Sequence, residues 1–95
     1  MNNDTPDKLF VRVVASRGIL AEEGGVSAVH IPSVNGELGI LPGHSSLIAA
    51  LGSGQLIIEK GSSHEEFQIH GGTAEIRSNR VIIFTSEGKD PSIPE

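Results

Sequence analysis

The chain contains no cysteine, tyrosine or tryptophan, and it has only three phenylalanines. Without cysteine it can form neither a disulfide framework nor a thiolate site. With so few aromatic rings it offers no platform on which bases or sugars would stack. Acidic residues outnumber basic ones by 12 to 7, which argues against a nucleic-acid surface, since that needs a basic stripe. These shortages argue against a nucleic-acid-binding protein and against a protein that binds sugars on aromatic faces.

Long apolar runs are also missing, because none approaches the roughly 18 residues of a membrane-spanning helix. The first seven residues are polar and acidic, unlike a signal peptide. A length of 95 residues fits one small domain. We expect that domain over residues 8–88, with a disordered tail over 1–7 and a second tail over 89–95, where prolines stand among charges.

Strands are favoured by the apolar content, which comprises 18 valines and isoleucines against 7 leucines. Apolar and polar residues alternate along most of the apolar runs, as they do in half-buried strands. The run over 80–86 is apolar on both faces and should be a central strand. We expect strands over 9–16, 26–31, 55–60, 66–70, 73–77 and 80–86; the segment 45–51 fits a helical turn or a strand, and its neighbours favour a strand.

Glycine, serine and asparagine separate these runs and predict turns at 17–18, 24–25, 52–54, 61–63, 71–72 and 78–79. Turns every eight to twelve residues are typical of an antiparallel sandwich or barrel. The sequence therefore predicts an all-β fold.

Motifs for catalysis are absent. The four histidines, His30, His44, His64 and His70, show no metal-ligand spacing such as H-E-x-x-H. Neither a G-x-S-x-G nucleophile elbow nor a G-x-x-x-x-G-K-[ST] phosphate loop occurs. His44 and Ser45 are adjacent on an extended chain and would point to opposite faces, which makes a poor nucleophilic pair. We expect no catalytic residue, no cofactor and no metal site.

Two acidic pairs, at 22–23 and 65–66, lie beside expected turns. The second follows His64 directly. Both pairs are typical of solvated hairpin ends, and we interpret them so.

Residues 36–44, G-E-L-G-I-L-P-G-H, are the most informative segment. Glycine and proline give a backbone of defined shape, and we interpret the segment as a loop, where binding residues tend to lie. Leu38, Ile40 and Leu41 cannot all turn inward from so short a segment. Some apolar surface should therefore face outward and suit a protein contact, with Glu37 and His44 as polar contacts at its rim.

This nonapeptide closely resembles a segment of the F-type ATP synthase epsilon subunit, which is called delta in mitochondria. The resemblance covers about residues 8–88, and the further motifs follow in the order that this family has. They are A-S at 15–16, G-Q-L-I-I at 54–58, H-E-E-F at 64–67, G-G at 71–72, E-I at 75–76 and N-R-V at 79–81.

The resemblance implies a flattened β-sandwich of about ten mostly antiparallel strands. It also implies a non-catalytic rotor subunit of the central stalk, which binds the gamma subunit along its side and rests on polar loops of the c-ring. Such a subunit couples ion translocation to ATP synthesis or hydrolysis and touches the alpha/beta catalytic head only indirectly. It is not a homo-oligomer, and it is peripheral to the cytoplasmic face of a bacterial inner membrane or the equivalent organelle face. The implied c-ring and gamma interface residues are Glu37, Leu38, Gly39, Ile40, Pro42, Gly43 and His44.

The family commonly adds a helical hairpin after the sandwich, which can inhibit hydrolysis and in some members binds ATP. No amphipathic helix is evident over 86–95, so we do not expect those roles here. The alternative hypothesis is a small cupin-like enzyme with a histidine-bound metal, or a sugar-binding β-barrel. It is motivated by the strands and the four histidines, and it requires a cluster of metal ligands.

Overall fold

The computed structural model describes residues 8–85 and 88–89, and strands are the only regular elements in that part of the chain. Within these residues no helix is long and apolar enough to cross a membrane. The tail expected over 1–7 and residues 90–95 of the tail expected over 89–95 lie outside the described residues, as does residue 86 of the expected strand 80–86. Lys89 is described and belongs to a strand, one residue beyond the expected domain end.

The strands are β1 (Leu9–Ala15), β2 (Gly18–Val26), β3 (Ala28–Ser33), β4 (Gly36–Ile40), β5 (Leu47–Lys60), β6 (Ser63–Arg77), β7 (Arg80–Phe84) and β8 (Gly88–Lys89).

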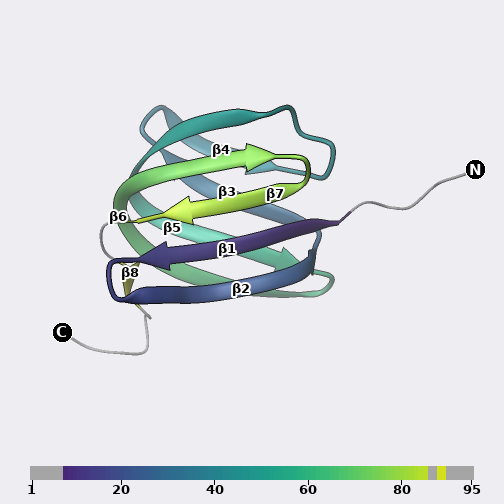
Figure 1. Cartoon of the computed structure of the whole chain (residues 1–95), viewed down its shortest axis with the longest axis horizontal. Helices are drawn as coiled ribbons and strands as arrows, with labels where there is room; N and C mark the ends of the chain where they lie inside the picture. Colours follow the sequence, from purple (N-terminus) through teal and green to yellow (C-terminus); the bar gives the residue numbers. More distant parts are fainter. Residues whose placement is uncertain (1–7, 86–87, 90–95) are drawn as a thin grey trace, which may run out of the picture.

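The strands form one sheet in the order β2-β1-β7-β6-β5-β3-β4, and β8 pairs with β6 outside this path. Every pair is antiparallel except β1 with β7, which run parallel. β5 and β6 are long strands of 14 and 15 residues that pair with each other along their length. Their two halves take different neighbours, so the sheet folds over on itself into two layers (Figure 1).

The front layer, nearer the viewer in Figure 1, contains β2, β1 and β7 with the second half of β6 and the first half of β5. The back layer contains β4, β3 and β8 with the other halves of β5 and β6. Eight strands, two of which serve both layers, thus supply the segments of the expected ten-stranded, mostly antiparallel sandwich. The all-β sandwich prediction is confirmed.

Glycines mark the corners where β5 and β6 pass from one layer to the other. Gly72 has φ +124°, and a Cβ atom added to it would lie 1.9 Å from the carbonyl oxygen of Phe84. No other residue fits such a close backbone approach. Thr85 secures the same corner, because its hydroxyl donates a 3.0 Å hydrogen bond to the carbonyl of Gly71.

Three of the expected turns are wrong, because glycine also marks bulges and bends inside strands. The glycines at 24–25 lie at a bulge within β2, and those at 52–54 and 71–72 lie inside β5 and β6. Turns at 16–17, 61–62 and 78–79 confirm the other three to within a residue. The ambiguous segment 45–51 is a strand from Leu47 onward.

The core lies between the two layers and is built from alternate residues of the strands. β7 is central, as predicted: it lies between β1 and β6, with Val81 and Ile83 fully buried. Its other apolar residues, Ile82 and Phe84, face outward. The largest fully buried side chains are Leu9, Val11, Val13, Val26, Val29, Ile31, Ile40, Leu56, Ile58, Ile69, Ile76 and Ile83.

Candidate protein-interaction surfaces

The nonapeptide is a strand followed by a tight turn, so its interpretation as one loop is wrong. Residues 36–40 form β4, paired antiparallel with β3 at one edge of the back layer. Glu37 and Gly39 are exposed, while Leu38 packs against the core and Ile40 is fully buried. The alternation of glutamate, leucine, glycine and isoleucine was the signal for this strand.

The seven expected interface residues therefore do not form one patch. Glu37 lies near the β3–β4 turn, whereas His44 lies beyond the other end of β4. Ile40 supports the segment from inside the core. The apolar side chain that the segment presents outward is Leu41, which is 59% exposed and was not among the expected interface residues. The expectation of outward apolar surface is met at this residue.

Residues 41–44 form a type II turn. The backbone N–H of His44 donates to the carbonyl of Leu41 over 3.1 Å, Pro42 occupies the second position, and Gly43 has φ +88° at the third. The His44 Nδ1–H donates to the carbonyl of Ser45 over 2.7 Å, since that oxygen can only accept. The turn therefore has a fixed shape.

Asn79 joins this turn to the front layer. Its side-chain oxygen accepts the backbone N–H of Gly43 over 2.8 Å, and its carbonyl accepts the N–H of Phe10 over 2.9 Å. Ser78 and Asn79 have φ of 51° and 62°, which is the type I′ geometry of a two-residue hairpin. The sequence predicted a turn here but gave no signal that Asn79 positions a second segment.

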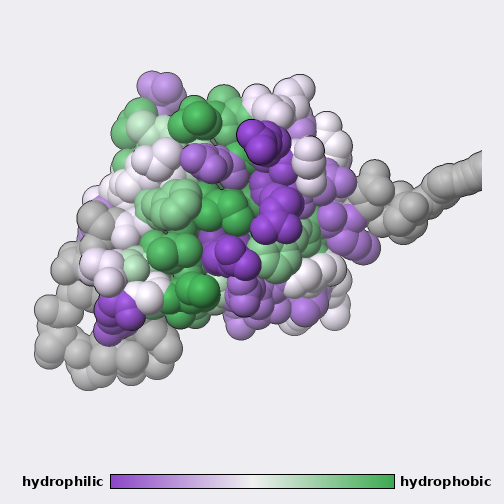
Figure 2. Space-filling view, viewed as in Figure 1, coloured by the Kyte–Doolittle hydropathy of each residue, from purple (hydrophilic) through white to green (hydrophobic). Residues whose placement is uncertain are grey.

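The outer face of the front layer carries a band of apolar side chains. Val14 pairs in register with Ile19 on one side and with Phe84 on the other. Ile48 and Ile82 both lie opposite Glu75 on the intervening strand. Ile48 is 71% exposed, Ile19 58% and Phe84 44%. Figure 2 shows hydrophobic surface across the middle of this face and hydrophilic residues to its right. We call these five residues the apolar band.

The outer face of the back layer is polar, and several of its charged groups bind one another. His30 Nε2 lies 2.9 Å from a carboxylate oxygen of Glu59. His64 Nε2 lies 3.3 Å from a carboxylate oxygen of Glu66. A groove of about 390 Å³ on this face is lined by Glu37 and other polar and apolar residues of β3, β4 and β5.

The acidic pair at 22–23 was expected at a solvated hairpin end, but it lies within β2 and makes ion pairs between strands. Glu22 pairs with Arg12, and Glu23 pairs with Lys60 over 3.2 Å. Such partly exposed pairs contribute little to stability, about 0–1 kcal/mol each. These two ion pairs nevertheless balance the negative charges of Glu22 and Glu23.

The histidines do not converge. Within the described part of the chain, no three side chains of the metal-ligating types gather as a metal site would require. His30 and His64 are engaged with glutamates, and His44 belongs to the type II turn. The cupin-like alternative therefore finds no ligand cluster among these residues.

Comparison with known proteins gives a family for most of the chain. Residues 8–89 match the model of the "ATP synthase, Delta/Epsilon chain, beta-sandwich domain". The chain is 40% identical over 81 residues to the ATP synthase epsilon chain of Leptospira borgpetersenii, covering 85% of this chain and 63% of that protein. It is 43% identical over 67 residues to the epsilon chain of Lawsonia intracellularis, covering 70% and 50%. The chain thus spans less than two thirds of the length of these relatives.

Solved structures of ATP synthases contain chains with the same fold. A chain of the Euglena gracilis mitochondrial ATP synthase, in a structure of OSCP, F1 and c-ring, superposes with a TM-score of 0.85 at 26% identity, covering 99% of this chain and 61% of that one. A chain from the central stalk and c-ring of the Tetrahymena thermophila enzyme shares the fold at 19% identity, with a TM-score of 0.74, covering 92% and 69%. The match over residues 8–89, the curated relatives and the shared two-layer fold place this chain in the ATP synthase delta/epsilon family, as its β-sandwich domain.

Proposed function

We propose that this chain is a non-catalytic rotor subunit of an F-type ATP synthase that joins the gamma subunit to the c-ring. The observation that carries this proposal is the family match over residues 8–89. The molecule also offers two kinds of contact surface. One is an apolar outer face, and the other is an edge strand with an exposed turn at each end.

The front face is the surface that we assign to gamma. The apolar band leaves three large side chains between 44% and 71% exposed, and a contiguous apolar area of this kind is typical of a protein contact. The exposed turn at Leu41 adjoins the same face, because Asn79 ties Gly43 to the β6–β7 turn. A partner on the front face would therefore reach Pro42, Gly43 and His44 as well.

Glu37 is the residue that we assign to a polar loop of the c-ring. It is exposed near the start of β4, and no ion pair holds it among the described residues. A carboxylate there can accept hydrogen bonds from basic or amide groups of a ring loop. Gly39 is exposed two residues further along the same edge and lets a partner backbone approach closely.

The chain would then transmit torque without taking part in chemistry. It would lie peripheral to the membrane, on the face that carries the catalytic head, which is the cytoplasmic face in bacteria. It needs no cofactor for this role. The catalytic alpha and beta subunits would be coupled to it only through gamma.

Assembly tests the proposal. The chain should copurify with gamma from a mixture of the purified subunits. In the assembled synthase, Glu37→Cys should form a disulfide with a cysteine placed in a c-ring polar loop. Glu65→Cys, also an exposed glutamate but next to the β5–β6 turn, is the matched control and should form none. A folded chain that does not bind gamma would refute the role, and a crosslink from the control alone would refute the assignment of Glu37.

A further inference from the structure

Two arginines border the apolar band at the end where β6 turns into β7. Arg77 and Arg80 are direct cross-strand partners that flank the two-residue turn. Like charges placed opposite each other on neighbouring strands are unfavourable. The turn fixes them there, because Ser78 and Asn79 both adopt positive φ. The fold therefore holds two arginines at directly paired positions, although like charges at such positions do not stabilise it.

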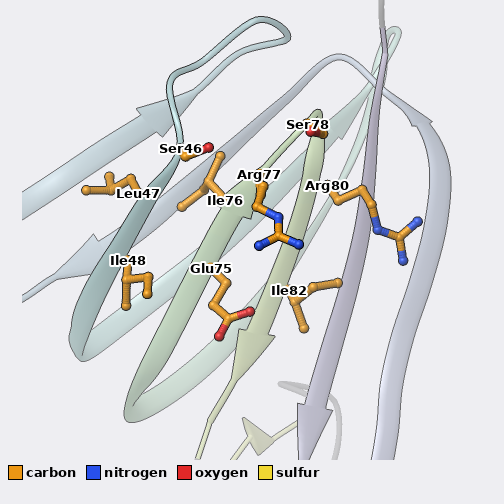
Figure 3. Close-up of a pocket in the computed structure, with 9 residues that line it drawn as sticks. All are labelled: Ser46, Leu47, Ile48, Glu75, Ile76, Arg77, Ser78, Arg80 and Ile82. Atoms are coloured by element: carbon orange, nitrogen blue, oxygen red, sulfur yellow. The ribbon is translucent and has the colours of Figure 1, made fainter.

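These cations are available to a partner. Arg12 on the same face is paired with Glu22, but among residues 8–85 neither Arg77 nor Arg80 makes an ion pair. The Arg80 guanidinium lies 4.7 Å from the centre of the Phe10 ring, a contact that orients it and leaves its N–H donors usable. In Figure 3 the Arg77 side chain extends across the pocket toward Glu75 and Ile82, while Arg80 extends away over the next strand.

The pocket beside them combines charge with apolar surface. It has a volume of about 610 Å³ and is lined by both arginines together with Ile48, Ile82 and Glu75. Glu75 in the lining would repel a phosphate group, with its charge of about −1.5 to −2, more strongly than it would repel a single carboxylate. A protein segment with apolar side chains next to isolated carboxylates fits better, since it would cover the isoleucines and place its acids on the arginines.

We propose that Arg77 and Arg80 bind carboxylates of the gamma segment that covers the apolar band, and that they fix the orientation of gamma on the front face. This inference rests on the proposed function. Charges at the border of an interface act mainly on the association rate and on specificity. In a chain of net charge −5, a local pair of cations also guides an acidic segment to one place.

Charge reversal tests the inference on affinity. The variant Arg77→Glu/Arg80→Glu should bind purified gamma about tenfold more weakly, mostly through slower association, and should lose most of the salt dependence of binding. Arg17→Glu, at the β1–β2 turn, is the control and should change the affinity less than about twofold. Unchanged affinity and salt dependence in the folded double variant would overturn the inference.

Carbodiimide coupling tests the contact itself and uses variants that keep the charge. Arg77→Lys and Arg80→Lys each supply an amine, which the reagent joins to a neighbouring carboxylate as an amide with loss of water. Mass spectrometry of the complex should place at least one such amide between position 77 or 80 and an aspartate or glutamate of gamma. Arg17→Lys should give none. Coupling from the control alone, or from no variant, would contradict the inference.

Two further outcomes separate the inference from the proposed function. If the unmodified chain does not bind gamma, the proposed function fails. If it binds gamma but the arginine variants instead lose only their retention on vesicles of phosphatidylcholine with phosphatidylglycerol, the arginines serve a lipid phosphate. In that case the inference alone is overturned.

Discussion

The two outer faces of this sandwich share strands β5 and β6 but have opposite character. On the back face, His30 and Glu59 bind each other, as do His64 and Glu66, so several of its charged groups are paired within the chain. On the front face, the apolar band is exposed and the two arginines beside it lack carboxylate partners among residues 8–85. The back face therefore presents mostly paired charges, apart from Glu37 at its edge, whereas the front face presents exposed apolar side chains beside two cations without carboxylate partners.

The difference also explains why the front strands do not follow a simple inside–outside alternation. β7 places Val81 and Ile83 in the core, yet Ile82 and Phe84 on its other face are apolar as well. A sheet face that meets only water is normally polar. Apolar residues on both faces of β7 therefore suit burial by the core on one side and by the proposed partner on the other.

At Gly72, β6 bends from one layer of the sandwich to the other, and a substitution at this corner should lower the unfolding free energy more than any other change considered. Gly72→Ala would place a Cβ atom 1.9 Å from the carbonyl oxygen of Phe84, so the backbone must move, and we expect a loss of unfolding free energy of at least ~3 kcal/mol. Gly24→Ala is the control, because an added Cβ there meets nothing within 4 Å. Urea unfolding should show a change below about 0.5 kcal/mol for that variant. Similar stabilities for the two variants would contradict the close corner.

Matched isoleucines test the faces themselves. Ile48 on the front face and Ile57 on the back face each lie opposite a glutamate of β6. Ile48→Gln should weaken gamma binding by about tenfold or more, because a buried isoleucine in an interface contributes roughly 1.5–3 kcal/mol. Ile57→Gln should leave the affinity within about twofold once urea unfolding has confirmed that the variant is folded. Titration calorimetry of each variant with gamma measures these affinities. Equal losses of affinity in the two variants would show that the two faces do not differ in their contact with gamma.

Alanine substitutions at two glycines of the nonapeptide should give the smallest difference in unfolding free energy. Gly43→Ala must adopt φ near +88°, and we expect it to cost about 1 kcal/mol of unfolding free energy. Gly39→Ala needs no positive φ and meets only the His30 ring at 3.6 Å, an ordinary contact. It should therefore change stability by less than about 0.5 kcal/mol in the same urea assay. If Gly43→Ala is as stable as Gly39→Ala, the turn does not require glycine.

Much of the fold could be predicted from residues alone. Period-two alternation located β1, the second half of β5 and two segments of β6, because one face of each is buried, and an apolar run on both faces located β7. The glycines at 52–54 and 71–72 were misread as turns, since a bend within a long strand and a turn between two short ones share the same residues. Only the pairing of β5 with β6, which keeps one register on both sides of the bend, distinguishes them.

Less of the site could be predicted. The nonapeptide was found by its composition, but Ile40 proved to be a core residue, while Leu41 is the exposed apolar residue. The apolar band could not be foreseen, because Ile48, Phe84 and Ile19 come from three strands that only the sheet order brings together. The role of Asn79 was equally hidden, since it depends on one hydrogen bond across 36 positions of sequence.

The absence of cysteine makes the central claim directly testable, because any thiol introduced into this chain is the only one. Ile48→Cys on the front face and Gln55→Cys on the back face should each be labelled by a maleimide in the free chain, since both positions are exposed. After a cysteine-free gamma subunit is added, we predict that labelling at position 48 slows by at least tenfold while labelling at position 55 is unchanged. Protection at position 55 instead, or at neither position, would contradict the account.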